Sequence, residues 1–267
     1  MEIATILNMI ESSNNVHILY ACEAGSRVWG FDSPDSDYDI RFIFHRPLET
    51  YCLLDQAPNT LEKTVDHYDF AGWDIKKSLE LLRKTNATLL EWLASPIRYI
   101  DRGELREDMT AYASIYQSPT AIRGHYAGMA LGNYIQYIKN PTDRREQIVT
   151  KKYLYVLNPL MKLIHYEQHP EELPPLNLTQ TLDCVDIPRE IRCEVEVLID
   201  LKKSGLELGK GPASPRLNIW IDAELDRFFS VKYPLQATKE QNTDVLNTIL
   251  LGVLRGKSCH PAPVSAS

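Results

Sequence analysis

The feature that most constrains the fold is a break between two short apolar runs near the N-terminus. The first run, VHILYAC at residues 16–22, stops shortly before Gly25 and Ser26. A turn-forming stretch, GFDSPDS, follows, and the second run, DYDIRFIF, then opens with Asp37 and Asp39. Short apolar runs bounded by Gly, Pro, Asp and Ser are typical of buried strands. The sequence therefore predicts two strands here, at residues 16–22 and 37–44.

The second strand carries two acidic residues on one face. Side chains alternate between the faces of a strand, so one face holds the apolar set Tyr38, Ile40, Phe42 and Phe44. The other face holds Asp37, Asp39, Arg41 and Ile43. Two carboxylates held this close repel each other, and a divalent cation removes the conflict. Mg²⁺ prefers such hard oxygen ligands together with substrate phosphates, and a pair of metal ions can stabilise both oxygens of a phosphoryl transfer.

Gly25, Ser26 and Gly30 fit the same chemistry. Glycine lets the backbone approach a ligand closely, and amides in a tight turn form a pocket for phosphate oxygens. A nucleotide and a metal ion would then meet between the Gly-Ser turn and the aspartate strand. The alternative interpretation of Asp37 and Asp39 is a solvated strand entry after the turn SPDS.

The rest of the chain changes character near residue 100. Before that point we expect a short opening helix, a third strand at residues 62–70, and helices at 72–84 and 87–95. After it, helical patterns dominate at residues 118–140, 145–168, 189–205, 217–229 and 243–257, with a possible kink at Pro159 and a proline-rich loop at 169–188. The prediction is an α+β fold: a catalytic module with a mixed sheet at residues 1–100, a helical domain at 101–258, and a disordered tail at 259–267.

Composition excludes several classes of protein. In 267 residues, no apolar run approaches the roughly 20 residues that span a membrane. The five cysteines are scattered and form no zinc-binding pattern, which indicates reduced thiols and a cytoplasmic protein. The net charge of −7 argues against broad, sequence-independent binding of nucleic acid.

The stretch GSRVWGFDSPDSDYDIRF resembles the signature of the DNA polymerase beta superfamily of nucleotidyltransferases, a Gly-Ser, a nearby glycine and an acidic-x-acidic strand. More narrowly, the chain resembles the YcgL-type predicted nucleotidyltransferases, an RNA-repair-associated polymerase-beta-like family. GWDIKKSLELLRKTNATLLEWLASP, KKYLYVLNPL and the long helical C-terminal half carry this closer likeness. The resemblance implies metal-dependent transfer of a nucleoside monophosphate from a nucleoside triphosphate to an acceptor, with release of pyrophosphate.

The resemblance also implies a third carboxylate on a later strand, for which Asp66, Asp69 and Asp74 are candidates. The family pattern places this carboxylate on Asp69 and leaves Asp74 at the start of a helix, where an N-cap role suffices. Asp37, Asp39 and Asp69 would then be the catalytic and metal-binding residues, with Asp69 also accepting the proton of the attacking hydroxyl. Alternation alone does not say whether Asp66 or Asp69 faces the site.

The expected nucleotide-binding residues are Gly25, Ser26, Arg27, Gly30, Lys77 and Lys152. Both lysines have a simpler interpretation as solvated helix residues, and Arg27 could equally pair with acidic neighbours. The expected cofactor is Mg²⁺ or Mn²⁺, and the expected nucleotide is ATP. The acceptor is open, with an RNA end considered first and a protein hydroxyl or a small molecule next. The alternative function is a non-catalytic nucleotide-binding regulator, like the antitoxin-type proteins of this fold.

Overall fold

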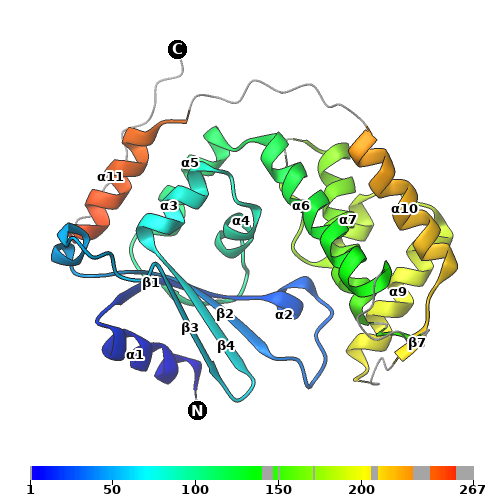
Figure 1. Ribbon diagram of the computed structural model, residues 1–267, viewed down its shortest axis with the longest axis horizontal. Coiled ribbons are helices and arrows are strands. Elements are labelled where there is room, and N and C mark those ends of the chain that lie inside the picture. Colours follow the sequence, from blue (N-terminus) through cyan, green and yellow to red (C-terminus); the bar gives the residue numbers. More distant parts are fainter. Residues whose placement is uncertain are drawn as a thin grey trace. The chain divides into compact units, whose positions relative to one another are not determined.

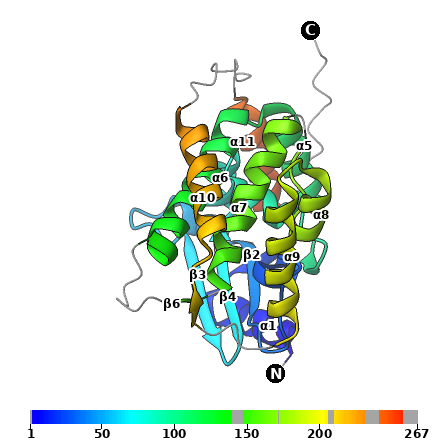
Figure 2. The same cartoon turned by 90° about the vertical axis from the view of Figure 1, so that its right-hand side faces the viewer.

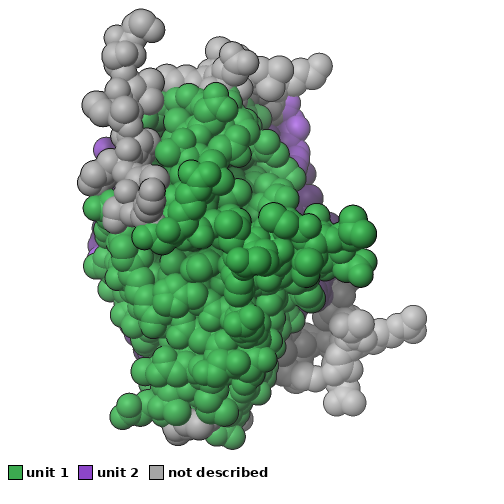
Figure 3. Space-filling view, turned by 90° about the vertical axis from the view of Figure 1, so that its left-hand side faces the viewer, with its two compact units in different colours: residues 1–28, 37–121, 237–267 green, residues 29–36, 122–236 purple. Residues whose placement is uncertain are grey.

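The computed structural model describes residues 2–139, 147–149, 151–170, 172–205, 210–230 and 241–256. The tail predicted at 259–267 lies outside these residues. Contacts divide the chain into unit 1 (residues 1–28, 37–121 and 237–267) and unit 2 (residues 29–36 and 122–236), and Figure 3 shows one face of unit 1. The division falls after residue 121, whereas the sequence analysis predicted a boundary near residue 100. It also assigns the C-terminal helix to unit 1 and the loop at 29–36 to unit 2.

Unit 1 is built on a five-stranded mixed sheet with the strand order β3-β4-β2-β1-β5 (Figure 1). Its strands are β1 (His17–Ala24), β2 (Tyr38–His45), β3 (Thr60–Val65), β4 (Tyr68–Asp74) and β5 (Arg98–Asp101). Strand β2 pairs parallel with β4, and the other three pairings are antiparallel. The first two strands follow the predicted apolar runs, because a near-continuous apolar run suits a strand in a sheet whose two faces are both covered by helices.

Helices cover both faces of this sheet (Figure 1). Helix α1 (Ile3–Asn14) lies on one face, and its buried residues Ile6, Leu7 and Ile10 pack into one core cluster with the apolar face of β2. The opposite face carries α3 (Ile75–Arg83), α4 (Ala87–Leu93) and α5 (Leu105–Tyr116). On that side Trp73 stacks on Trp92 at 3.8 Å between ring centroids. The sequence predicted α1, α3 and α4 but not α5 or β5.

The predicted third strand is in fact a hairpin. Strands β3 and β4 are joined by Asp66 and His67, and Asp66 has a left-handed backbone with φ +52°. Strand β4 then runs to Asp74, whose carboxylate accepts a hydrogen bond from the Lys76 N–H at 2.9 Å and caps α3. The predicted N-cap role of Asp74 is thereby confirmed. The prediction of a single strand over 62–70 was wrong. The turn was missed because Asp66-His67 is not a typical two-residue hairpin sequence.

Unit 1 contains further helical segments besides these. They are α2 (Gly25–Trp29), whose last residue already belongs to unit 2, the 3₁₀ turn Leu48–Cys52, and α11 (Thr243–Leu254).

Unit 2 is mainly helical (Figure 2). Its elements are α6 (Pro119–Tyr134, beginning at the end of unit 1), a π-helical turn (Ile135–Lys139), β6 (Gln147–Val149), α7 (Lys151–Gln168), α8 (Leu178–Cys184), α9 (Arg189–Lys203), β7 (Lys210–Pro212) and α10 (Pro215–Ser230). Helix α7 contains Pro159 and begins at Lys151, later than the predicted 145, because β6 precedes it. Helix α8 lies in the predicted proline-rich loop and is capped by the Asn177 side chain.

The loop at residues 29–36 packs among the helices of unit 2. Trp29 and Phe31 each form a T-shaped ring contact with Tyr155 on α7. Gly30 has φ +78°, and a Cβ there would lie 2.1 Å from the Asn177 amide nitrogen. At the far end of the loop, Lys202 Nζ on α9 donates to Ser33 Oγ at 2.7 Å. The loop is therefore fixed at several points along its length.

Helix α7 also buries polar side chains. Asn158, Lys162 and His165 are each at most 3% exposed and recur at helical spacing on one face. Lys162 lies near the rings of Trp29 and Tyr126. Among the helices that the structure describes, none is both long and apolar enough to cross a membrane.

The burial of His165 should make the free energy of unfolding depend on pH. Burial lowers the pKa of His165 below its ordinary value of 6.5, and the neighbouring His169 adds to this effect. The unfolded chain therefore binds the proton more readily, and stability is lost as pH falls through 6.5. His165→Asn should reduce the drop in urea-unfolding midpoint between about pH 7.5 and about pH 5.5.

The matched control is His67→Asn, at a histidine that is exposed at the hairpin turn. The control should keep the wild-type drop in midpoint. An unchanged pH dependence in His165→Asn would contradict the assignment to His165.

Candidate functional site

The parallel pairing of β2 with β4 places two of the predicted aspartates side by side. Asp39 and Asp69 are register partners, and so are Arg41 and Ala71, and Ile43 and Trp73. Partners in neighbouring strands point to the same face of a sheet. That face is the one covered further along by α3 and α4, and Asp39 and Asp69 lie at its more open end. Their side chains are 30% and 44% exposed.

Arg41 joins these two carboxylates. Its Nη2 donates to Asp39 Oδ1 at 2.8 Å, and its Nη1 lies 2.9 Å from Asp69 Oδ2. The guanidinium also donates to the main-chain carbonyl of Asp69 at 3.1 Å. The sequence placed Arg41 on the acidic face of the strand but assigned it no role.

Gly25 approaches the second oxygen of Asp39. Its backbone is left-handed, with φ +63°, and a Cβ at this position would lie 1.9 Å from Asp39 Oδ2. Any side chain would therefore displace the Asp39 carboxylate, which explains the requirement for glycine. Asp37, directly before β2, is exposed.

The electrostatics of Asp39 reflect this crowding. Burial raises the pKa of Asp39 above its ordinary value, and the nearby carboxylates of Asp69 and Asp37 raise it further, while Arg41 opposes the rise. Arg41 thus pairs with two carboxylates, and the Asp37 carboxylate adds to the negative charge around Asp39. Such a group gains stability from an additional cation.

Glu23 is a residue that the sequence did not identify. It is 1% exposed on β1, and its Oε1 accepts the Asp39 N–H at 2.8 Å, while its Oε2 accepts the Tyr99 hydroxyl at 2.5 Å. Burial raises its pKa, and the two hydrogen bonds oppose the rise. An acidic residue inside the apolar run LYACEAG was the available signal. Glu23 therefore holds the main chain of Asp39 in place through this hydrogen bond.

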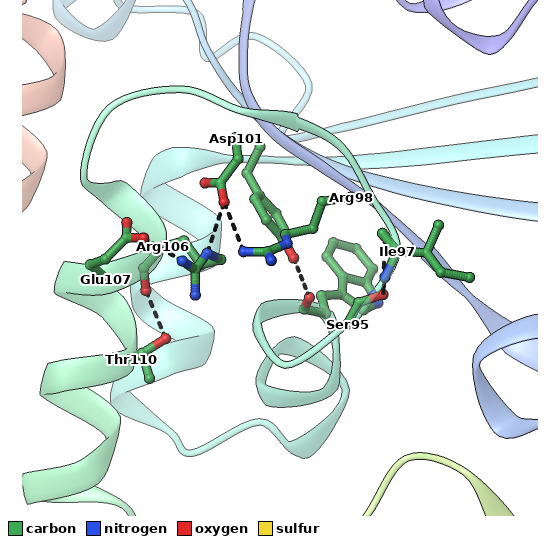
Figure 4. A network of polar contacts seen from close by, with 9 residues as sticks. Ser95, Ile97, Arg98, Asp101, Arg106, Glu107 and Thr110 are labelled. Atoms are coloured by element: carbon green, nitrogen blue, oxygen red, sulfur yellow. Dashed lines mark hydrogen bonds and ion pairs between the residues drawn. The ribbon is translucent and has the colours of Figure 1, made fainter.

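The main chain of Glu23 is held in turn by the segment before β5. The Ser95 hydroxyl donates to the Glu23 carbonyl at 2.7 Å, and the Glu23 N–H donates to the Ile97 carbonyl at 2.9 Å. Figure 4 shows this segment, where Asp101 at the end of β5 accepts from Arg98 and from Arg106 on α5. The site is therefore supported by the edge strand and by the helix that follows it.

The predicted phosphate-binding residues take different positions. Ser26 is buried directly after Gly25. Arg27 Nε donates to the Asp37 carbonyl at 3.3 Å, and its guanidinium lies 3.6 Å from the centroid of the Tyr38 ring. Arg27 thus orders the start of β2. Gly30 belongs to unit 2, where its close neighbour is Asn177.

Lys77 is not brought to the aspartates. Asp69 and Asp74 are separated by roughly 16 Å along β4 at ~3.3 Å per residue, and Lys77 follows Asp74 on α3. Its Nζ donates to Thr60 Oγ1 at 2.7 Å and lies near the Trp73 ring. Asp74 accepts the Tyr51 hydroxyl at that same end of the sheet. Of the three candidates for the third carboxylate, the structure therefore places Asp69 beside Asp39. Asp66 lies at the hairpin turn, and Asp74 lies at the other end of β4.

Lys152 is on α7 of unit 2. Its Nζ lies 4.2 Å from the centroid of the Tyr137 ring and 5.0 Å from that of Tyr155. Burial lowers its pKa, and the charge of Lys151 contributes to the shift.

The chemistry of the carboxylates fits a magnesium-type cation with few protein ligands. Asp37 and Asp39 offer the hard oxygens that Mg²⁺ and Mn²⁺ prefer, and such ions commonly complete their shell with water and phosphate. Within the ranges that the structure describes, no three His, Cys, Asp or Glu side chains converge on one metal position.

Comparison with known proteins shows the family of this chain. Residues 1–252 match the family described as RlaP, the RNA repair pathway DNA polymerase beta family. The chain belongs to this family. It is also 34% identical over 249 residues to the uncharacterized protein YcgL of Bacillus subtilis (strain 168), covering 93% of this chain and 94% of that protein. Membership of the RlaP family suggests a nucleotidyltransferase-like role in RNA repair, and it confirms the resemblance inferred from the motif.

Glu23 and Tyr99 provide a test of the support behind Asp39. Glu23→Ala should lower the free energy of unfolding by roughly 2–4 kcal/mol, because it leaves the part-buried Asp39 N–H and Tyr99 hydroxyl without their acceptor. Tyr99→Phe removes one hydroxyl and should cost about 1 kcal/mol. Urea denaturation measures both values. A cost for Glu23→Ala no larger than that of Tyr99→Phe would contradict the role assigned to Glu23.

Proposed function

We propose that this protein is a metal-dependent nucleotidyltransferase that moves a nucleoside monophosphate from a nucleoside triphosphate to an acceptor hydroxyl. The observation that carries the proposal is the in-register placement of Asp39 and Asp69 next to Gly25, in a chain of the RlaP family. Asp37, Asp39 and Asp69 form its catalytic group, and Gly25 and Ser26 form the turn beside the phosphates.

The reaction forms a bond between the acceptor oxygen and the α-phosphorus and breaks the bond from that phosphorus to the pyrophosphate. Asp69 accepts the proton of the acceptor hydroxyl. Mg²⁺ or Mn²⁺, held by Asp37 and Asp39, would neutralise phosphate charge as the bonds exchange. Glu23 keeps Asp39 in place, and Gly25 leaves room for its carboxylate. Positioning and charge neutralisation supply the catalysis, and no covalent intermediate is required.

An RNA end is the acceptor that the family description favours, and ATP is the nucleotide we expect. The net charge of −7 means that RNA would be bound at a local site and not by the whole surface. A protein hydroxyl or a small molecule is the next acceptor to test.

A transfer assay tests the proposal. Purified protein is incubated with Mg²⁺ and each of the four α-³²P-labelled nucleoside triphosphates, with pooled RNA, the protein itself and a protein extract as acceptors. Label should move to one acceptor in the wild type, and Asp37→Asn and Asp39→Asn should each reduce the rate by about a thousandfold or more, because charge neutralisation is lost.

Asp66→Asn is the matched control. Asp66 is exposed at the β3–β4 turn with φ +52°, a conformation that asparagine also adopts readily. This variant should keep wild-type transfer. Retained activity in Asp39→Asn would overturn the assignment, and tight nucleotide binding without any transfer would favour the non-catalytic regulator.

Lys152 is proposed as a contact to the triphosphate, because related nucleotidyltransferases often place such a lysine on a helix of the second module. Lys152→Ala should raise the KM for the nucleotide by about tenfold with a smaller change in kcat. Lys151→Ala, at the exposed neighbouring lysine, is the control. Equal KM values for both variants and the wild type would remove Lys152 from the site.

A further inference from the structure

The oxygen atoms of the three aspartates are not equally available. Asp39 Oδ1 and Asp69 Oδ2 are both taken by Arg41, and Asp69 Oδ1 lies 3.5 Å from the Thr64 hydroxyl. In the part of the chain that the structure describes, Asp39 Oδ2 and both carboxylate oxygens of Asp37 accept no hydrogen bond or ion pair. A metal ion on Asp37 and Asp39 would therefore not compete with Arg41 for a carboxylate oxygen.

Arg41 is firmly fixed between its two partners. Besides the carboxylates, its Nη1 donates to the main-chain carbonyls of Asp69 at 3.1 Å and Ile40 at 3.3 Å. Its side chain is 19% exposed and rises from the middle of a central strand. A planar guanidinium that makes several charge-assisted bonds loses little entropy for each bond it forms. Moving Arg41 aside would leave Asp39 and Asp69 facing each other unpaired.

We propose that Arg41 is a positioning residue that acts as a built-in cation between Asp39 and Asp69, so that the substrate-free site takes one divalent cation, on Asp37 and Asp39, instead of two. This inference rests on the proposed function and specifies its metal requirement. The charges then balance, because three carboxylates face one guanidinium and one divalent ion. Asp69 is held for the proton of the acceptor hydroxyl and does not ligate the resting metal.

The test is the number of Mn²⁺ ions bound per chain without nucleotide, counted from the electron paramagnetic resonance signal of free Mn²⁺. Leaving nucleotide out excludes ions that arrive with the triphosphate. Wild-type protein should bind one ion. Arg41→Gln frees Asp39 Oδ1 and Asp69 and should bind two. Arg98→Gln, which removes an exposed arginine on β5 with a single carboxylate partner, should bind one.

A second variant keeps the test decisive if Arg41→Gln does not fold. Asp69→Asn should keep the Kd for Mn²⁺ within about twofold of wild type, whereas Asp37→Asn should raise it by about tenfold or more, because Asp37 ligates the ion and Asp69 does not. A tenfold loss in Asp69→Asn would overturn the role of Arg41. So would two ions in the wild type.

The failure of this inference can be separated from failure of the proposed function. Two ions bound together with nucleotidyl transfer would overturn only the role of Arg41. No bound Mn²⁺ and no transfer would overturn both.

Discussion

The candidate site depends on one constraint, the parallel pairing of β2 and β4 that sets Asp39 beside Asp69. Two carboxylates on neighbouring strands repel each other unless positive charge lies between them. Arg41 supplies one such charge from the same strand face, two residues after Asp39. Glu23 holds the main chain of Asp39 from β1, and Gly25 gives its carboxylate the space that a side chain would fill. These features form a partly neutralised acidic group that still favours one further cation.

Much of this could be predicted from the sequence because it is local. Alternation in DYDIRFIF places Asp39 and Arg41 on one face, and the Gly-Ser turn is a short-range signal. Asp74 could be recognised as an N-cap from its position before a helical pattern. The family resemblance then indicated Asp69 among three candidates.

Other features depend on pairing between distant segments, which periodicity does not encode. The choice of Asp69 over Asp66 requires the register of β2 against β4 and the hairpin that reverses the chain at Asp66. Lys77 looked suitable as a basic residue at a helix start. It lies on α3, however, which begins at the end of β4 that is far from Asp69. Glu23 was overlooked because its partners, Asp39 and Tyr99, come from other strands of the sheet.

The motif is divided between the two units along the sequence. Residues 29–36, between the Gly-Ser turn and Asp37, belong to unit 2, where Tyr155, Asn177 and Lys202 contact them. The two halves of the motif in unit 1 are therefore joined by a loop that the helices of unit 2 hold.

Diffraction from crystals soaked in Mn²⁺, collected at the manganese absorption edge, tests the central claim most directly. The proposed function predicts an anomalous peak within bonding distance of Asp37 and Asp39, and the positioning role of Arg41 predicts that it stays paired to Asp69. A peak only at some other place, or none beside Asp37 and Asp39 in crystals that take up Mn²⁺, would contradict it.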